Sequence, residues 1–273
     1  MGEAVLLSVE DRVLRGLAVR KGSISVPQWE SLLPAQALNN GMPEQIEILG
    51  DFLGDLVLNQ GLMGQALRVA LPLQAAHWRV ITWPLDEWPD DPIEALRTLD
   101  PELGLPFALA DAAIDLQPLP GRPLRSLLVA APTVLVEAWS AVAEVAGVRL
   151  DRLLPAQVCL RQALLPALQA QDPRDGVLVL HPAGLACMAT LWQQGVPLYE
   201  RQFDADDPRL GEQLQEIVDY YGSHDSRFGL RKLLTTAVVP QQSQLAQTLQ
   251  VPLEQLDWAP YDSPVMQGLA QAQ

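Results

Sequence analysis

The chain has 273 residues, 49% of them hydrophobic, and its 18 basic and 33 acidic residues give a formal net charge of −15. This length allows one or two domains with a large core. An acidic surface repels phosphate backbones and anionic lipid headgroups, so nucleic acid and direct membrane adsorption are disfavoured. No apolar run of about 18 residues is present and the N-terminus is acidic, so we expect neither a membrane-spanning helix nor a secretory signal.

The first elements in chain order are a strand hairpin and a helix. Apolar runs at residues 4–9 and 13–19 predict two strands around the turn Glu10-Asp11-Arg12. A helical stripe follows, with Pro43 and Glu44 in its first turn and Gly61 at its end. The stripe consists of Ile46, Leu49, Leu53 and Leu56.

The middle of the chain changes composition. A strand is expected at residues 66–71, and the Pro-rich, acidic stretch after it predicts a small inserted unit, with a helix near Ile93–Leu99 and a strand near Ala113–Leu119. A strand at residues 124–131 then leads to a helix with Thr133 as its N-cap and Gly147 as its C-cap. The core stripe of this helix is Leu135, Ala138, Val142 and Val145.

The second half begins after a linker-like stretch, residues 168–176. The stretch "GVLVLHPAGLACMATLWQQGVPLYERQF", residues 176–203, reads as three strands, from Val177 to Leu180, from Cys187 to Trp192 and from Val196 to Phe203. A helix follows, and both halves share the order of a strand hairpin, then helices, then further strand–helix units, which indicates an α/β protein with layered sheets. The stripe of this helix is Leu210, Leu214, Ile217 and Tyr221.

Several ordered pieces resemble one family. "LLPAQALNNGMPEQIEILGDFLGDLVLNQGLMGQALRVALP", "LGLPFALADAAIDLQPL", "LLVAAPTVLVEAWSAVAEVAGVRLDRLLPAQVCLRQAL" and "PVMQGLAQA" are similar to successive passages of PilM, the actin-like cytoplasmic protein of type IV pilus assembly and a relative of the cell-division protein FtsA. The resemblance runs almost end to end. It implies an actin-like, ribonuclease H-like fold of two lobes, with a small subdomain inserted in the first. We expect the lobes at residues 1–167 and 168–273 and the insert at about 73–123.

The resemblance also implies an ATP site between the lobes, held by three Gly-containing turns, since Gly lets backbone N–H groups approach phosphates. Each turn departs from the family pattern. Leu6 stands where the first hairpin has Asp and Ser8 where it has Gly. Leu180-His181-Pro182 replaces the second Asp-Ile-Gly, and Pro182 lacks an N–H. Ala237-Val238 replaces the Gly-Gly turn, and its side chains are expected to fill the nucleoside's space.

Candidate chemical groups have ordinary interpretations as well. Glu10 and Asp11 are either replacement metal ligands or solvated turn acids, and the absence of a phosphate cradle favours the second. His181 is either a general base or a structural histidine, and it has no nucleophile or carboxylate nearby in sequence. The cysteines, Cys159 and Cys187, read as buried free thiols.

The remaining patterns give no further chemistry. The three histidines, His77, His181 and His224, lack metal-ligand spacing, and no nucleophile elbow, P-loop, paired Cys-X-X-Cys or His-Glu-X-X-His motif is present. We therefore expect no catalytic, cofactor-binding or metal-binding residue.

Three tryptophans fall within eleven residues, at Trp78, Trp83 and Trp88. They either cover the core of the small insert, the favoured interpretation, or grip a partner, since Trp is enriched at interface hot spots.

The function implied by the resemblance is a non-catalytic scaffold, cytoplasmic and peripheral to the inner membrane. It would bind the cytoplasmic tail of a PilN-type single-span protein and pass contacts to the assembly ATPase. Two alternatives stay open: an ATP-binding actin-like switch of the same machinery, and an unrelated α/β enzyme.

Overall fold

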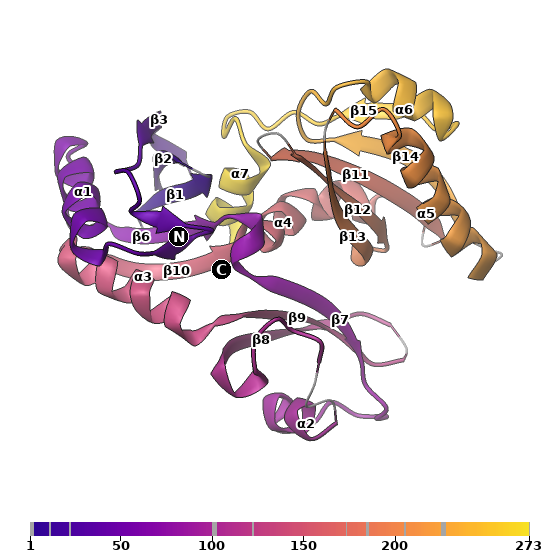
Figure 1. Ribbon diagram of the computed structural model, residues 1–273, viewed down its shortest axis with the longest axis horizontal. Coiled ribbons are helices and arrows are strands. Elements are labelled where there is room, and N and C mark those ends of the chain that lie inside the picture. Colours follow the sequence, from indigo (N-terminus) through magenta and orange to yellow (C-terminus); the bar gives the residue numbers. More distant parts are fainter. Residues whose placement is uncertain are drawn as a thin grey trace. The chain divides into compact units, whose positions relative to one another are not determined.

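The computed structural model describes residues 3–10, 12–21, 23–99, 103–121, 123–172, 174–183, 186–204, 206–224 and 228–272. The chain forms two compact units, one of residues 1–159 with 269–273 and one of residues 160–268. Each unit is built on a five-stranded sheet, and the first carries a smaller three-stranded sheet as well (Figure 1). The expected α/β architecture of two lobes with a small inserted unit is therefore confirmed. No helix within the described ranges combines the length and apolarity needed to cross a bilayer.

The large sheet of the first unit has the order β3-β2-β1-β6-β10. Its first three strands are antiparallel, whereas β6 and β10 run parallel to β1. The bounds are β1 (Ala4–Glu10), β2 (Val13–Arg20), β3 (Ser23–Leu32), β6 (Ala66–Leu71) and β10 (Arg149–Pro155), and a short hairpin of β4 (Leu38–Asn39) and β5 (Met42–Pro43) lies between β3 and the first helix. The hairpin and β6 agree with the prediction, while the half-polar edge strands β3 and β10 were not predicted.

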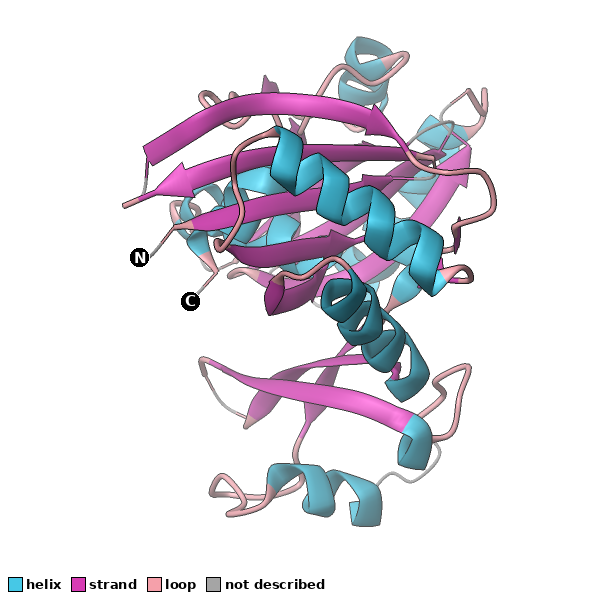
Figure 2. Ribbon diagram, turned by 90° about the vertical axis from the view of Figure 1, so that its left-hand side faces the viewer, coloured by secondary structure: helices cyan, strands magenta, loops and turns pink. Residues whose placement is uncertain are grey.

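Two helices, α1 (Ile46–Asn59) and α3 (Thr133–Val145), lie against one face of this sheet (Figure 2). Helix α1 buries Leu49 and Leu53, as its stripe predicts, but Pro43 belongs to β5 rather than to the first helical turn. Gly61 ends the helix at φ +68°, with its N–H bonded to the Leu58 carbonyl. This is the left-handed C-terminal position that Gly occupies most easily.

Helix α3 corrects two predictions. Thr133 is its first residue rather than its N-cap, a place taken by Pro132 without a side-chain hydrogen bond. Val145 is not a core residue, because its side chain is 42% exposed, and the buried stripe runs through Trp139 instead. The indole N–H of Trp139 donates to the Gly41 carbonyl at 2.9 Å, which explains how so large a polar-tipped side chain is buried.

The inserted subdomain is a three-stranded antiparallel sheet, β7-β9-β8, with helix α2 packed beside it (Figures 1 and 2). Its core includes Trp83, Leu96, Leu103 and Leu128. The helix predicted near residues 93–99 and the strands predicted near 113–119 and at 124–131 are present, and β7 is a strand that was not predicted. The bounds are β7 (His77–Thr82), α2 (Pro92–Leu99), β8 (Ala112–Leu119) and β9 (Arg125–Pro132).

The sheet of the second unit has the order β13-β12-β11-β14-β15 and repeats the layout of the first. Three antiparallel strands are again followed by two parallel ones. This identity of topology confirms the shared order that the sequence indicates in both halves. The strands are β11 (Asp175–Ala183), β12 (Ala186–Gln193), β13 (Val196–Asp204), β14 (Gly229–Thr235) and β15 (Leu253–Gln255).

The helices of this part of the chain are α4 (Ala156–Gln169), α5 (Leu210–His224), α6 (Gln242–Thr248) and α7 (Pro264–Gln271). Of these, α5 was predicted, and its stripe faces the core through the buried Leu210 and Leu214.

Candidate functional site

The first of the three turns expected to bind a nucleotide is made of sheet residues. Leu6 and Ser8 lie in β1, between β2 and β6, with exposed fractions of 0% and 2%. Because β1 pairs on both sides, its backbone groups are used in the sheet. Glu10 forms an ion pair with Arg15, and Asp11 lies outside the described residues. At the positions expected to contact a nucleotide, the described part of this hairpin therefore has a buried leucine and a carboxylate that is already ion-paired.

The second turn is displaced relative to the prediction, because β11 continues through His181 and Pro182 to Ala183. His181 is therefore a strand residue opposite Met188, not a turn residue. Its Nδ1 atom lies 2.7 Å from Oγ1 of Thr236. Burial lowers the pKa of His181 to about 4, so its ring is neutral near pH 7 and has a hydroxyl partner already. Through this contact the imidazole ties the end of β11 to the residue that follows β14.

The third turn follows β14. The Thr236 N–H donates to the Leu180 carbonyl at 3.0 Å, and the Thr236 carbonyl accepts from the indole N–H of Trp258 at 2.6 Å. Both backbone groups that precede Ala237 are thus occupied within the unit. The side chains of Ala237 and Val238 are exposed, Val238 at 70%. The family pattern has Gly-Gly at these two positions, so this chain exposes two side chains where that pattern has only backbone.

Metal ligands do not gather in the described ranges, where no group of three or more His, Cys, Asp or Glu side chains could hold an ion. Both cysteines are free and buried, as predicted. Burial raises the pKa of Cys159 to about 12 and that of Cys187 to about 11, so neither is a thiolate near neutral pH. His77 lies on β7, where desolvation and then Arg79 lower its pKa, and the side chain of His224 is outside the description.

The tryptophans of the insert are mostly core residues. Trp83 is 2% exposed and its indole N–H donates to the Ser126 hydroxyl at 3.1 Å. Trp88 packs edge-on against Trp83, with ring centroids 5.4 Å apart. For these two residues the structural interpretation is confirmed. Trp78 is only half-buried, on β7 itself.

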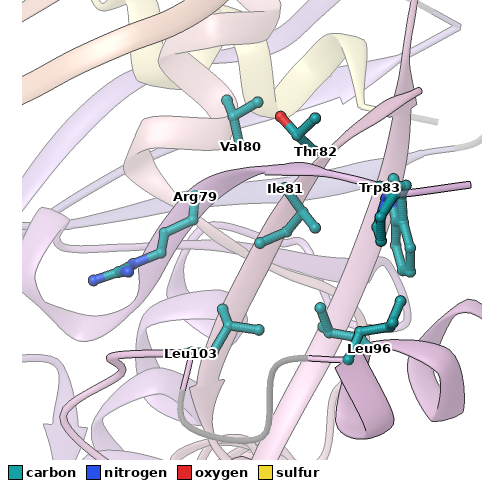
Figure 3. A pocket seen from close by; sticks show the side chains of 9 residues that line it. Arg79, Val80, Ile81, Thr82, Trp83, Leu96 and Leu103 are labelled. Carbon is teal, nitrogen blue, oxygen red and sulfur yellow. The ribbon is translucent and has the colours of Figure 1, made fainter. Parts of the chain in front are cut away.

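A pocket of about 410 Å³ lies beside β7 and is the candidate site that the sequence did not reveal. Figure 3 shows Arg79, Ile81 and Trp83 on one side of the strand, directed toward the α2 side, while Val80 and Thr82 point to the other. The wall opposite β7 is apolar, and Arg79 is the charged residue of the lining within the described chain. Leu96, Leu99 and Leu103 form that apolar wall.

The open edge of β7 borders this pocket. Strand β7 is at one end of the order β7-β9-β8 and pairs with β9 along its whole length. The N–H of Trp83 donates to Leu124, on the side of β9. Since backbone groups alternate along an antiparallel strand, the N–H groups of Val80 and Thr82 face away from β9, where no described strand pairs with them. An unpaired edge beside an apolar pocket is an arrangement that accepts an extended peptide.

Comparisons with known proteins agree on the architecture. No family model and no curated protein matches the sequence. Among solved structures, a chain of the PilM-PilN type IV pilus biogenesis complex is similar over 98% of this chain and 97% of that one, with a TM-score of 0.74 and 16% identity.

Two further structures share the architecture over almost their whole length. The cytoplasmic domain of EpsL, an inner-membrane component of the Vibrio cholerae type II secretion system, gives a TM-score of 0.58 at 13% identity, covering 99% of this chain and 94% of its own. A Bacteroides thetaiotaomicron protein with an actin-like ATPase fold and unknown function gives 0.57 at 9% identity, covering 99% and 96%. This chain therefore has the actin-like fold that its sequence resemblance implies, in an arrangement similar to that of the chain from the PilM-PilN complex.

Proposed function

We propose that this protein is a non-catalytic, actin-like scaffold of a type IV pilus or related secretion machine. The observation that carries the proposal is the state of the three turns: a buried leucine, a neutral histidine followed by proline, and a Thr-Ala-Val stretch occupy the positions where the family pattern has small residues and carboxylates. A phosphate cradle needs free N–H groups and close backbone approach, and these residues reduce both. The likeness in fold to a chain of the PilM-PilN complex supports the choice of machinery.

The partner we propose is the cytoplasmic tail of a PilN-type single-span membrane protein, which would hold the scaffold at the cytoplasmic face of the inner membrane. The site that suits an extended tail best is the outer edge of β7. There the tail would pair with Val80 and Thr82 through backbone hydrogen bonds and place an apolar side chain in the pocket next to Leu99. Strand addition supplies affinity through the backbone and specificity through alternate side chains. Contacts from the scaffold to the assembly ATPase would then use other surfaces.

A matched pair of variants tests this site. Val80→Pro removes an outward N–H but leaves the ladder to β9 intact, because proline is tolerated on the free side of an edge strand. Val80→Thr keeps the N–H and the branched shape. We expect a synthetic tail of the organism's PilN-type protein to bind the wild-type chain and Val80→Thr with similar Kd values, and Val80→Pro at least about tenfold more weakly. Calorimetric titration of all three chains measures this.

Two results would contradict the proposal in different ways. If the tail binds none of the chains, the PilN-type partner is wrong. If it binds all three equally, the partner stands but the edge of β7 is not its site. Circular dichroism of each variant checks that the fold is retained.

A further inference from the structure

Helices α1 and α3 form one continuous layer over the large sheet of the first unit. A Cβ placed on Gly50 would lie 2.5 Å from the Val145 side chain, and one on Gly54 would lie 3.2 Å from the Ala146 carbonyl oxygen. The two glycines therefore let the helix backbones approach closely. In Figure 2 the two helices lie on the viewer's side of the sheet, and no other described element of this unit crosses in front of them.

The outward face of this layer carries acids and no bases. Neither helix contains Lys or Arg. Five carboxylates are exposed on it, and none of the five forms an ion pair within the described part of the chain, although acids elsewhere, such as Glu3 and Asp175, pair with arginines. The five are Glu47, Asp51, Asp55, Glu137 and Glu144.

Large apolar side chains are interspersed among these acids. Ile48 is 50% exposed, Leu58 61%, Val134 60% and Val145 42%. Of these, Val145 lies against Gly50, at the contact between the two helices. Unpaired charge of one sign attracts a partner of the opposite sign, and the exposed aliphatic groups beside it provide apolar area that a bound partner would bury.

We propose that this acidic helix face docks a basic amphipathic helix of a partner protein. The charge of the face selects the occupant. A second copy of this chain would set five carboxylates against five, and an anionic membrane surface would be repelled in the same way. The two helices have 14 and 13 residues, so the layer they form is long enough to be covered by a helix of about three to four turns. This partner is additional to the tail proposed for β7, and the two sites use different residues.

The probe is a fluorescent synthetic peptide of about 14 residues with Leu at helical spacing and Lys beside it, and its control is the same composition in scrambled order. We expect the amphipathic peptide to bind the full chain at least about tenfold more tightly than the scrambled one, measured by fluorescence anisotropy. On binding, hydrogen exchange should slow in residues 46–59 and 133–145.

Three double variants locate the interaction. Asp51→Asn with Asp55→Asn should weaken binding about tenfold and flatten its salt dependence. Ile48→Ser with Val145→Ser should also weaken it about tenfold. The matched control, Glu216→Gln with Asp219→Asn on the exposed side of α5, removes the same charge elsewhere and should leave binding within about twofold of wild type.

Three outcomes would overturn the proposal. Equal weakening by the α5 control would show that net charge alone attracts the peptide. Equal binding of the scrambled peptide would show that no amphipathic helix is recognised. A wild-type dimer in sedimentation that Ile48→Ser with Val145→Ser dissociates would assign the face to self-association.

Discussion

His181 in β11 and Thr236, the residue that follows β14, lie side by side in the second unit, with Nδ1 of the histidine 2.7 Å from Oγ1 of the threonine. Next to them, the Thr236 N–H bonds to the Leu180 carbonyl. The end of β11 and the start of the turn after β14 are thereby tied together by one side-chain and one backbone hydrogen bond. In the family pattern these two positions belong to the nucleotide site, whereas in this chain they are hydrogen-bonded to each other.

The first prediction concerns pH. Although part of its surface is open to solvent, the His181 ring is desolvated enough that its folded-state pKa falls from 6.5 to about 4. The unfolded chain therefore takes up a proton at higher pH than the folded chain does. The stability due to this group is fully present above pH 6.5 and is lost as the pH falls toward 4, by up to about 3 kcal/mol.

His181→Asn isolates this contribution, because the amide keeps a partner for Thr236 but does not titrate. Urea unfolding at several pH values should show a shallower loss of unfolding free energy between pH 6.5 and 4 in the variant than in the wild type. If the two curves fall in parallel, folding does not lower the pKa of His181.

The second prediction concerns the contact between α1 and α3. Gly50→Ala puts a Cβ within 2.5 Å of the Val145 side chain and 3.1 Å of the Val142 carbonyl oxygen. The helices must separate, so we expect a loss of about 1–3 kcal/mol in unfolding free energy. Gly222→Ala is the matched control, since a Cβ there meets nothing within 4 Å and should raise helix stability by up to about 1 kcal/mol. Two variants that change stability in the same direction would contradict the close packing at Gly50.

The third prediction concerns nucleotide binding. A ligand at about 100 times its Kd stabilises a protein by about 2.7 kcal/mol through mass action. With Leu6 buried and Pro182 unable to donate, we expect Mg-ATP to produce no concentration-dependent rise in melting temperature. A rise that saturates with ATP would favour the actin-like switch over the scaffold, and would do so without any measurement of hydrolysis.

The fourth prediction concerns the cysteines. Cys159 and Cys187 are both 0% exposed, and burial raises their pKa values to about 12 and about 11. Iodoacetamide reacts with thiolates, so we expect no labelling of the native chain at mildly alkaline pH and labelling of both residues in denaturant. Mass spectrometry separates the two sites. Rapid native labelling of either one would show that its unit opens.

The sequence predicts the apolar, periodic parts of this fold well and the half-polar parts poorly. The buried stripe of α1 was readable because every third to fourth residue is apolar, and β6 was readable because it is a nearly continuous apolar run. Strand β3 alternates exposed and partly buried residues and contains Pro27, so its pattern resembles a loop. The predicted core place of Val145 was wrong because Gly50 admits that residue at the helix contact, a partner 95 positions away in sequence.

The sequence predicted which nucleotide-binding residues are missing, but not where the pocket beside β7 lies. Pro182 and the missing glycines can be seen in the sequence alone, but the open edge of β7 cannot, because edge position depends on which strands pair. Two local signals were present. The stretch from Trp78 to Thr82 contains β-branched and aromatic residues, and Pro84 follows it, which is the composition of a strand that ends before a proline.

One connection in the first unit has a mechanical consequence. Strand β9 ends at Pro132 and helix α3 begins at the very next residue, so the central strand of the small sheet and a helix of the large layer form a single strut. Within the described part of the chain, the strand pairing of β7 is made to β9, one end of that strut. A force applied to β7 therefore reaches α3 through a direct chain connection, and the C-terminal end of α3 contacts Gly50 of α1.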